Sequence, residues 1–428
     1  MKYKAVLDNT YSLCTYLALP GILGHLLFRG IKNPEYHRRN SERMGYVPFA
    51  PLTDSIWIHA VSVGEVQSAH PLAQKILKES ICMDMLVTTT TPTGSKQMQN
   101  SFPQSVFHSY LPYDIPFFVK RFLPSINPKL AIFMETEIWP NIFKLCSHNS
   151  IPLVIANARL SPSSLQGYKK IKFFIKPVLN YCQKILAQSD KDAERFLSLG
   201  AAEHKVITTG NMKYDIELSE KKIHKGRELK AKLHSKTAIW IAASTHNTEE
   251  DLLLDVHAKL LQEEPNALLI IVPRHPERFE TAANLCCKYG LKFQRHSARE
   301  EINPDIQVYL GDTMGDLSTY YAAADIAFVG GSLAEIGGHN MLEPAALGLP
   351  IFTGPHLFNF QEISKKLQEN RAITVINSSP ELLNNLCSIL NSPENIQTMG
   401  ERAKQVVLEN QGAVEKSFNQ LIELIYPT

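Results

Sequence analysis

The run AIWIAAS (residues 238–244) carries no charged side chain and is followed directly by the polar residues Thr245 and His246. A short apolar run of this kind, followed by an amphipathic stretch of helical length, is typical of a buried strand in a parallel sheet. A matching run, SIWIHAV (55–61), lies in the first half of the chain. The sequence therefore predicts one α/β pattern that begins twice.

Similar apolar runs continue through both halves, separated by helix-length amphipathic stretches. In the first half they are 55–61, 85–90, 130–135, 152–158, 185–189 and 206–210, with helices expected at 65–79, 138–147 and 190–199. In the second half they are 238–244, 267–273, 306–311, 325–331, 350–354 and 372–376, with a long closing helix expected over about 394–425. This alternation predicts two doubly wound, Rossmann-like α/β domains that face each other.

A highly charged segment with few apolar residues, 217–236, separates the halves and is expected to form a solvated linker and helix. The predicted domains are 29–215 and 216–428, preceded by a separate N-terminal segment, 1–28. Ligands of open parallel sheets bind beyond the carboxyl ends of the strands. A cleft between the two domains is therefore the expected site.

The composition of the 428 residues is that of a globular protein, with 44% hydrophobic and 20% charged residues. A formal net charge of +2 argues against a dedicated nucleic-acid binder. Seven cysteines without a CxxC spacing favour reduced thiols in the cytosol. The DxD at 190–192 follows Ser189, which can cap a helix, so we expect it to be structural and expect no metal site.

The N-terminal stretch 9–28 contains no Asp, Glu, Lys or Arg and nearly matches the ~20 residues that a spanning helix needs. Its polar residues and Pro20 weaken that interpretation, and a helix buried in the soluble domain is the alternative. The arginines and lysine that follow it favour a membrane anchor facing the cytosol. A second basic and aromatic segment, 166–184, suits an anionic lipid surface or is an ordinary surface helix.

Polar residues lie where predicted strands end, as a ligand site requires. Glu65 follows the first strand and is a candidate general base, or else only complements a helix dipole. Glu135 and Glu137 follow the 130–135 strand and can equally belong to a charged turn. Lys213 is a candidate for stabilising an anionic transition state, or an exposed loop lysine. Arg274, stiffened between two prolines, suits bidentate contact with a phosphate.

The stretch GGSLAEIGGHNMLEPAALGLP (330–350) combines two glycine pairs with a carboxylate at the start of an expected helix. Free amides at a helix start favour an anion, whereas the Glu343 carboxylate suits the hydroxyl groups of a ribose. The segment lacks the GxGxxG and P-loop patterns. It therefore indicates a site for the sugar and phosphate of a nucleotide.

A family resemblance joins these segments. The stretches SVGE (62–65), METEIWPN (134–141), GNMKYD (210–215), IIVPRHPERF (270–279), GDTMGDL (311–317) and FVGGSLAEIGGHNMLEPA (328–345) resemble the 3-deoxy-D-manno-octulosonic acid (Kdo) transferases of Gram-negative bacteria. The match runs in order from about residue 26 to the end of the chain. It implies a GT-B glycosyltransferase of two Rossmann-like domains with an N-terminal membrane-associated helix, the first domain binding acceptor and the second binding donor.

The resemblance also implies substrates, partners and site residues. The donor is CMP-Kdo and the acceptor is lipid IVA, on the cytoplasmic side of the inner membrane with its anionic lipid surface; transfer inverts the anomeric centre and needs no cofactor or metal. Glu65 corresponds to the base, and Glu135 and Lys213 to groups that stabilise the transition state. The residues that correspond to CMP contacts are Pro273, Arg274, Met314, Gly315, Asp316, Asn340, Met341, Leu342 and Glu343. Asp316 stands where the family often has Glu, which leaves its contact with the nucleotide open.

Two other functional classes are compatible with the residues alone. A nucleotide-sugar epimerase can share the two-domain fold and needs neither a membrane segment nor a lipid acceptor. A non-catalytic membrane-associated binding protein would release no CMP with any acceptor. The number of Kdo residues transferred is not determined by the sequence.

Overall fold

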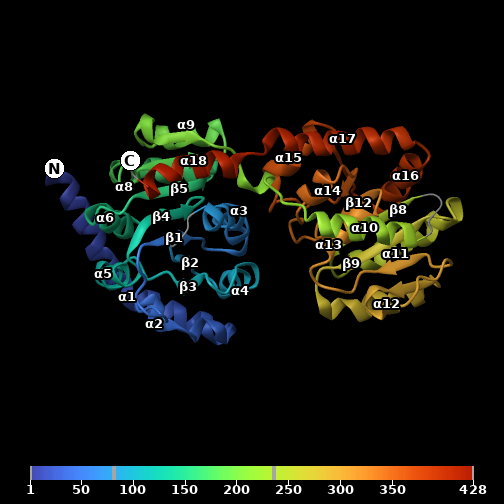
Figure 1. Cartoon of the computed structure of the whole chain (residues 1–428), viewed down its shortest axis with the longest axis horizontal. Helices are drawn as coiled ribbons and strands as arrows, with labels where there is room; N and C mark the ends of the chain where they lie inside the picture. Colours follow the sequence, from blue (N-terminus) through green and yellow to red (C-terminus); the bar gives the residue numbers. More distant parts are fainter. Residues whose placement is uncertain (1, 80–82, 234–237, 427–428) are drawn as a thin grey trace. The chain divides into compact units, whose positions relative to one another are not determined.

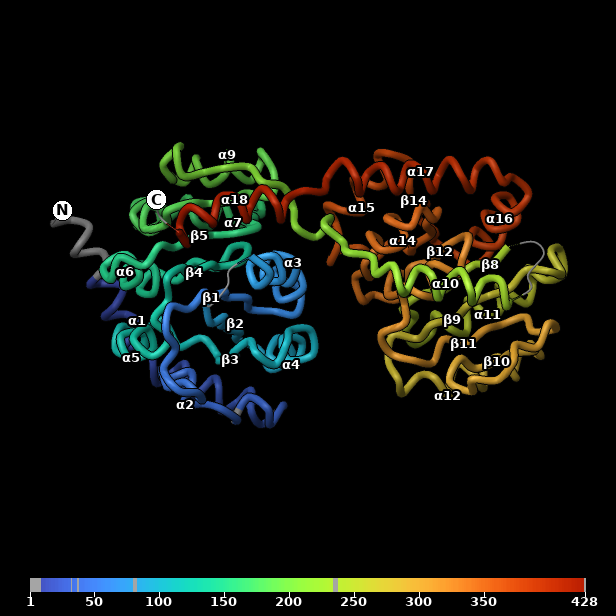
Figure 2. The backbone as a smooth tube through the Cα atoms, in the orientation of Figure 1, coloured from blue at the N-terminus to red at the C-terminus, as the bar shows by residue number. Residues whose placement is uncertain are grey.

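The computed structural model describes residues 2–79, 83–233 and 238–426, so Cys82 and residues 234–236 of the expected linker lie outside the described residues. The chain forms two compact units. The first unit comprises Met1–Asp215 together with Asn410–Thr428, and the second comprises Ile216–Glu409. In Figure 2 the first unit contains the blue to green part of the chain and also its red C-terminal end.

The first unit is built on a seven-stranded parallel sheet in the order β3-β2-β1-β4-β5-β6-β7. Its strands are β1 (Ser55–His59), β2 (Met85–Thr89), β3 (Phe107–Tyr110), β4 (Pro128–Met134), β5 (Leu153–Ala158), β6 (Lys184–Ala187) and β7 (Val206–Thr208). Its helices are α1 (Lys2–Lys32), α2 (Asn40–Arg43), α3 (Val63–Glu79), α4 (Pro92–Ser101), α5 (Pro116–Ile126), α6 (Pro140–His148), α7 (Pro162–Lys170), α8 (Lys172–Leu179), α9 (Asp190–Ser198) and α18 (Ala413–Ile425).

The second unit repeats this plan with a parallel sheet in the order β10-β11-β9-β8-β12-β13-β14. Its strands are β8 (Ile239–Thr245), β9 (Leu268–Pro273), β10 (Phe293–Arg295), β11 (Val308–Leu310), β12 (Ile326–Val329), β13 (Ile351–Thr353) and β14 (Ile373–Val375). Its helices are α10 (Glu220–Lys232), α11 (Glu249–Glu263), α12 (Phe279–Lys288), α13 (Leu317–Ala323), α14 (Leu342–Ala346), α15 (Gln361–Glu369), α16 (Ser379–Leu390) and α17 (Pro393–Asn410).

Each sheet is covered on both faces, which explains why its strands are apolar without alternation. In β1 the side chain of Trp57 packs with Phe122 and Phe133 on one face, whereas Ile56 and Ile58 pack on the other. Successive side chains of a strand point to opposite faces, so a single run of apolar residues supplies two cores. The second unit has the same pair of cores around β8.

The C-terminal part of the chain differs from the expected single helix over 394–425. Gly412 has a φ of 93°, a left-handed conformation that ends regular helix, and α17 and α18 lie on either side of it. The Asp215 carboxylate accepts hydrogen bonds from the amides of Gly412 and Val414, at 2.5 and 2.6 Å. Figure 1 shows α18, in red, over the sheet of the first unit. The chain after Asn410 therefore belongs with the first unit, whereas the expected second domain ran to residue 428.

The N-terminal helix α1 is attached to the first unit by polar side chains. Tyr11 donates to Asp114 at 3.0 Å, Ser12 donates to Asn141 at 2.6 Å, and Tyr16 accepts from the amide of Phe117 at 3.1 Å. Figure 1 shows α1 beside α5 and α6. A fully buried N-terminal helix, the alternative expectation, does not hold, because only 6% of the apolar segment of α1 is buried.

The remaining surface of α1 is apolar and exposed. Residues Asn9–Ile31 form the one helix among the described residues that is long and apolar enough to cross a membrane, with a mean hydropathy of 1.4 and 6% of the segment buried. Leu17 is 72% exposed and Ile31 is 78% exposed. On the neighbouring α8, Phe173 is 55% exposed between lysines. The ring of Tyr11 lies 5.2 Å from that of Phe174, which joins α1 to α8.

Candidate functional site

The order of the strands locates one candidate site in each unit. Connections from β1 run towards β2 on one side and β4 on the other, so the order reverses between β1 and β4. In the second unit the same reversal lies between β8 and β12. Ligands of open parallel sheets bind beyond the carboxyl ends of the strands at such a reversal point. The predicted site residues Glu65 and Glu135 follow β1 and β4, as this rule requires.

Glu65 lies in the first turn of α3, where its carboxylate turns back to its own loop. Its Oε2 accepts a hydrogen bond from the amide of Val61 at 2.8 Å, and its Oε1 accepts one from Ser62 Oγ at 3.2 Å. Burial raises the pKa of Glu65 to about 8, the negative charges of Glu137 and Glu135 add to this increase, and the Val61 amide partly opposes it. A carboxyl group with this pKa can accept and release a proton near neutral pH.

Glu135 and Lys213 are brought together beside Glu65. The Lys213 Nζ lies 3.5 Å from Glu135 Oε1, and both side chains are partly buried. Glu135 has a φ of 55°, a strained conformation for a residue other than glycine, which is often found at functional sites. Lys213 lies in a short 3₁₀ helix, Met212–Tyr214, that is held to the sheet because Asn157 Oδ1 accepts from the Met212 amide at 3.0 Å. The three predicted catalytic residues therefore share one site.

His59 and Glu137 complete this group. His59 is fully buried, and its Nδ1 lies 2.9 Å from Thr88 Oγ1 and 3.2 Å from the Thr88 carbonyl. Burial lowers the pKa of His59 to about 3, so its ring is neutral. Among the described residues its Nε2 has no hydrogen-bond partner, and it faces Glu137 Oε2 at 4.0 Å. Burial also raises the pKa of Glu137, whose Oε2 accepts from Trp139 Nε1 at 3.0 Å.

No role is predicted for His59 from the sequence, because this residue lies inside an apolar strand. The signal was nevertheless present: a histidine in SIWIHAV interrupts an otherwise apolar run just before the reversal point.

In the second unit, Glu343 is held by two polar neighbours. Its Oε2 accepts from Ser318 Oγ at 3.1 Å and its Oε1 from Asn340 Nδ2 at 3.4 Å, while burial raises its pKa. The helix that begins there, α14, has only five residues, and its Leu342 amide already donates to Asn340 Oδ1 at 3.1 Å. The expected anion site at this helix start is therefore weaker than the sequence indicated, because a single turn has little dipole.

The other predicted CMP contacts lie on loops of the same unit. Met314 is 58% exposed, Gly315 has a φ of 91°, and Asp316 Oδ2 accepts from Thr313 at 2.7 Å. Lys222 links this turn to Glu343, because its Nζ donates to the Gly315 carbonyl at 2.8 Å and its charge lowers the pKa of Glu343.

Three further predicted contacts differ from these in exposure. Arg274 is exposed just after β9, whereas the side chains of Met341 and Leu342 are buried in the core. Met341 and Leu342 can therefore offer a ligand only their backbone.

A glutamate that the sequence analysis did not single out organises the glycine-rich loop. Glu249 is buried, and its carboxylate accepts from the amides of His246, Gly331, Ser332, Leu333 and Ala334 at 2.8–3.3 Å. Amides that converge in this way form an anion-binding nest. Here the protein's own carboxylate fills the nest, so these amides are already bonded.

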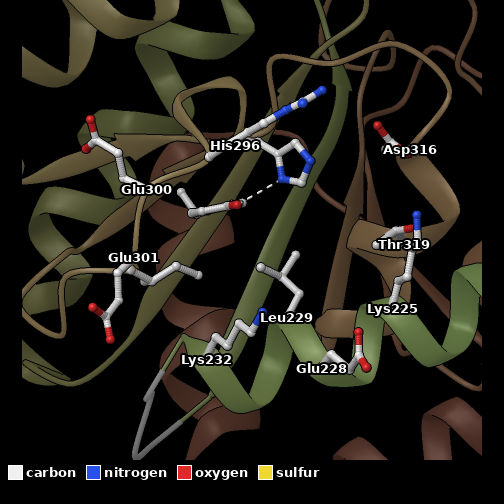
Figure 3. Close-up of a pocket in the computed structure, with 12 residues that line it drawn as sticks. Lys225, Glu228, Leu229, Lys232, His296, Glu300, Glu301, Asp316 and Thr319 are labelled. Carbon is white, nitrogen blue, oxygen red and sulfur yellow. Dashed lines mark hydrogen bonds between the residues drawn. The ribbon is translucent and has the colours of Figure 1, made fainter.

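A cavity of about 650 Å³ lies in the second unit, bordering only one predicted contact, Asp316. Figure 3 shows Lys225, Leu229 and Lys232 along α10 on one side of it. His296 lies on the other side, and its Nδ1 is 2.8 Å from the Tyr309 hydroxyl. Its mixture of cations and carboxylates indicates no single ligand.

The described residues contain no group of three or more His, Cys, Asp or Glu side chains placed to hold a metal ion. The DxD segment is structural in the way the sequence predicted. Ser189 caps α9 by accepting from the Asp192 amide at 3.2 Å, and Asp192 is buried, where it accepts from the Leu160 amide at 3.0 Å.

Comparisons with known proteins identify relatives of both halves. Residues 38–216 match the family described as 3-deoxy-D-manno-octulosonic-acid transferase (kdotransferase), and residues 225–406 match glycosyl transferases group 1. The 3-deoxy-D-manno-octulosonic acid transferase of Haemophilus influenzae is 41% identical over 420 residues, which is 97% of this chain and 97% of that protein. The protein of the same name from Bordetella pertussis is 34% identical, over 87% of this chain and 88% of its own.

Solved structures with low sequence identity share the fold. A UDP-GlcNAc 2-epimerase from Neisseria meningitidis has a TM-score of 0.55 at 13% identity, over 87% of this chain and 99% of that one. A glycosyltransferase from Rickettsia africae has a TM-score of 0.54, also at 13% identity, over 88% of this chain and 100% of that one. At this identity the likeness concerns the fold alone, and it confirms the predicted GT-B class.

Proposed function

The chain belongs to the 3-deoxy-D-manno-octulosonic acid (Kdo) transferase family, and from this premise we propose that it transfers Kdo from CMP-Kdo to the 6′-hydroxyl of lipid IVA with inversion. The family match spans residues 38–216, which is most of the first unit, and the relative from Haemophilus influenzae is matched over 97% of its length. The proposal is supported most directly by one observation, the partly desolvated Glu65 carboxyl at the reversal point of the first sheet.

In the proposed reaction Glu65 acts as the general base. Its carboxylate accepts the proton of the acceptor hydroxyl while the hydroxyl oxygen attacks the anomeric carbon of Kdo. The bond between that carbon and the phosphate oxygen breaks on the opposite face, and its electron pair leaves with CMP. Attack opposite the leaving group inverts the anomeric configuration, and no metal takes part in any step.

The remaining residues are assigned to charge and position. Lys213, held by Glu135, supplies a cation for negative charge that develops at the reacting centre. Arg274 contacts the phosphate, and Glu343 accepts hydrogen bonds from the ribose hydroxyls in place of its present partners Ser318 and Asn340. The turn Met314–Asp316, together with the backbone of Asn340–Leu342 and Pro273, completes the CMP site.

The acceptor is a lipid, so the first unit must work at a membrane surface. We propose that the apolar face of α1 and the exposed Phe173 enter the cytoplasmic side of the inner membrane, with nearby lysines at anionic head groups. The polar contacts of Tyr11, Ser12 and Tyr16 hold α1 along the first unit, which supports a position in the interface.

Replacing Glu65 with Gln tests the base directly. The variant keeps the size of the side chain but cannot accept the proton, so turnover with CMP-Kdo and lipid IVA should fall by about 10²–10⁴-fold. CMP affinity, measured by calorimetry, should stay unchanged because Glu65 belongs to the first unit. The exposed Glu79→Gln on the same helix is the matched control. Turnover close to wild type in Glu65→Gln would show that this residue is not the base.

Treatment of the wild-type protein with EDTA tests the metal-free mechanism, which predicts unchanged turnover. Loss of turnover in EDTA would contradict that mechanism.

A further inference from the structure

Three histidines converge at the reversal point of the second sheet, outside the residues assigned above. His246 follows β8, His275 follows β9 and His339 lies in the loop after β12, and these three strands are neighbours in the sheet. The Nε2 atoms of His246 and His339 lie 2.7 Å apart, and their rings are 5.0 Å apart and parallel within 6°. The His275 ring lies edge-on to His246 at 5.3 Å.

The position of His339 is fixed by the glycine loop beneath it. Gly331 has a φ of 66°, and a Cβ added there would lie 2.7 Å from the His339 ring. No larger residue therefore fits while the ring keeps this position. The loop is held in turn by Glu249, whose carboxylate occupies the converging amides. Because those amides are already bonded to Glu249, they are not available to an anion that binds at this reversal point.

The charges around the histidines favour an anion. The charged groups that face His246 and His339 are Arg274, Arg278, Glu249 and Glu250, and His275 is a further titratable neighbour. Arg278 is bonded to Glu250 at 2.7 Å, and Glu249 is bonded to backbone amides. Among the described residues, Arg274 makes no ion pair, so a positive charge beside the histidines is left without a counter-charge.

The same surroundings favour the neutral form of both histidines. Burial, followed by the effects of His246, Arg274 and His275, lowers the pKa of His339 to about 4. The pKa of His246 is also lowered, mainly by burial and then by its cationic neighbours, although Glu249 opposes this. An oxyanion placed between the rings and Arg274 would reverse this effect, because it favours the protonated imidazoles.

We propose that His246, His339 and Arg274, with His275 at the rim, form a binding site for an oxyanion of the donor, either its phosphodiester or the carboxylate of its sugar. The identity of the donor rests on the proposed function, whereas the binding of an oxyanion between these side chains is independent of that function. When an anion replaces the contact between the two Nε2 atoms, each imidazolium can donate one hydrogen bond to it through Nε2, and the exposed Arg274 guanidinium can reach the same group from outside.

Calorimetry with CMP and cytidine tests the site on the whole protein. Loss of a hydrogen bond to a charged group corresponds to roughly a tenfold or greater loss of affinity, so His246→Gln and His339→Gln should each weaken CMP binding by about that factor. Cytidine, which lacks the phosphate, should bind all variants equally. His224→Gln changes an exposed histidine of the same unit and should bind CMP as the wild type does. Unfolding temperatures of all variants confirm that the unit is folded.

The number of protons taken up on CMP binding distinguishes direct contact with the anion from a purely structural role of the histidines. CMP binding to the wild type should take up protons near pH 6, seen as a binding enthalpy that depends on the ionisation enthalpy of the buffer, and the two histidine variants should lose this dependence. Binding of free Kdo distinguishes the phosphodiester from the sugar carboxylate as the bound group. If the histidine variants lose affinity for Kdo but not for CMP, the site binds the carboxylate of the sugar.

Inorganic phosphate makes the test independent of the proposed function. Phosphate should shift the ring signals of His246 and His339 in NMR spectra and raise their pKa, whether or not the protein transfers Kdo. Absence of Kdo transfer with this shift intact would overturn the proposed function alone. Unchanged affinity of both histidine variants for CMP and for Kdo, without proton uptake in the wild type, would overturn the oxyanion site alone.

Discussion

Glu65 and Glu249 each follow the first strand of their unit, but different hydrogen-bond partners give the two carboxyl groups different properties. Glu65 follows β1 and receives one backbone amide and one hydroxyl, while burial and two other carboxylates raise its pKa to about 8. Glu249 follows β8 and receives five backbone amides. The first group has a pKa near neutral pH, as the proposed base requires, whereas the second is fully hydrogen-bonded and holds a loop.

The raised pKa of Glu65 predicts the pH dependence of the reaction. A base must be ionised, and a carboxyl with a pKa of about 8 is mostly protonated at pH 7. The kcat/KM of the wild type should therefore rise about tenfold per pH unit below pH 8 and level off above it. Steady-state rates between pH 6 and 9.5 measure this, with unfolding temperature followed across the range as a control. A flat profile from pH 6 to 9 would contradict the assignment of a raised pKa to the base.

Removing the charge of Glu249 should destabilise the second unit. In Glu249→Gln one acceptor oxygen becomes an NH₂ group that faces backbone donors, so buried amides lose their partner at a cost of about 1–3 kcal/mol. Thermal unfolding should shift down by roughly 2–4 °C per kcal/mol. The exposed Glu263→Gln, on the same helix, should unfold as the wild type does. Equal unfolding temperatures for the two variants would show that the amide contacts contribute nothing.

At the residue scale, the sequence predicted which carboxylates end strands but not what surrounds them. Glu65, Glu135 and Lys213 were predicted together, and the structure brings Glu135 and Lys213 to 3.5 Å. The surroundings of His59 and His246 depend on residues and strands distant in the chain, which no local pattern encodes. A histidine in an apolar strand is compatible with simple core packing, and only the orphaned Nε2 of His59 distinguishes the two cases.

At the scale of elements, the apolar runs predicted the long buried strands correctly, because strands covered on both faces are apolar throughout. The short edge strands β3 and β10 were not predicted, since their partly exposed residues give no apolar run. The break between α17 and α18 was missed for a different reason. Gly412 alone is a weak stop signal, and the Asp215 carboxylate that accepts from its amide lies 197 residues away.

The apolar face of α1 predicts protection of a thiol by lipid. Cys14 lies on α1 and is exposed, and Cys287 is exposed in the second unit. Vesicles that contain anionic phospholipid should slow the reaction of Cys14 with a water-soluble maleimide several-fold and leave Cys287 unchanged. Mass spectrometry of peptides measures both sites in one sample. Equal labelling of Cys14 with and without vesicles would show that α1 stays out of the bilayer.

At the scale of the whole molecule, the chain passes from the first unit to the second at residue 215 and returns at residue 410. Asp215 lies at both of these points. It is the last residue of the first segment, and its carboxylate accepts hydrogen bonds from the amides of Gly412 and Val414 at the start of α18. The charged segment 217–236 is the basis of the predicted domain boundary between residues 215 and 216. No sequence signal predicts the return at residue 410, since the amphipathic helices of both units have the same pattern.

The proposed reaction joins the acidic sugar of a cytidylate donor to a lipid alcohol. Mass spectrometry of the lipid, after incubation of the purified protein with CMP-Kdo and lipid IVA, detects this product. We expect lipid IVA that carries one or more Kdo residues, with one CMP released for each, and no such product from Glu65→Gln. Release of CMP without any change in the mass of the lipid, or an altered nucleotide sugar formed without acceptor, would contradict it.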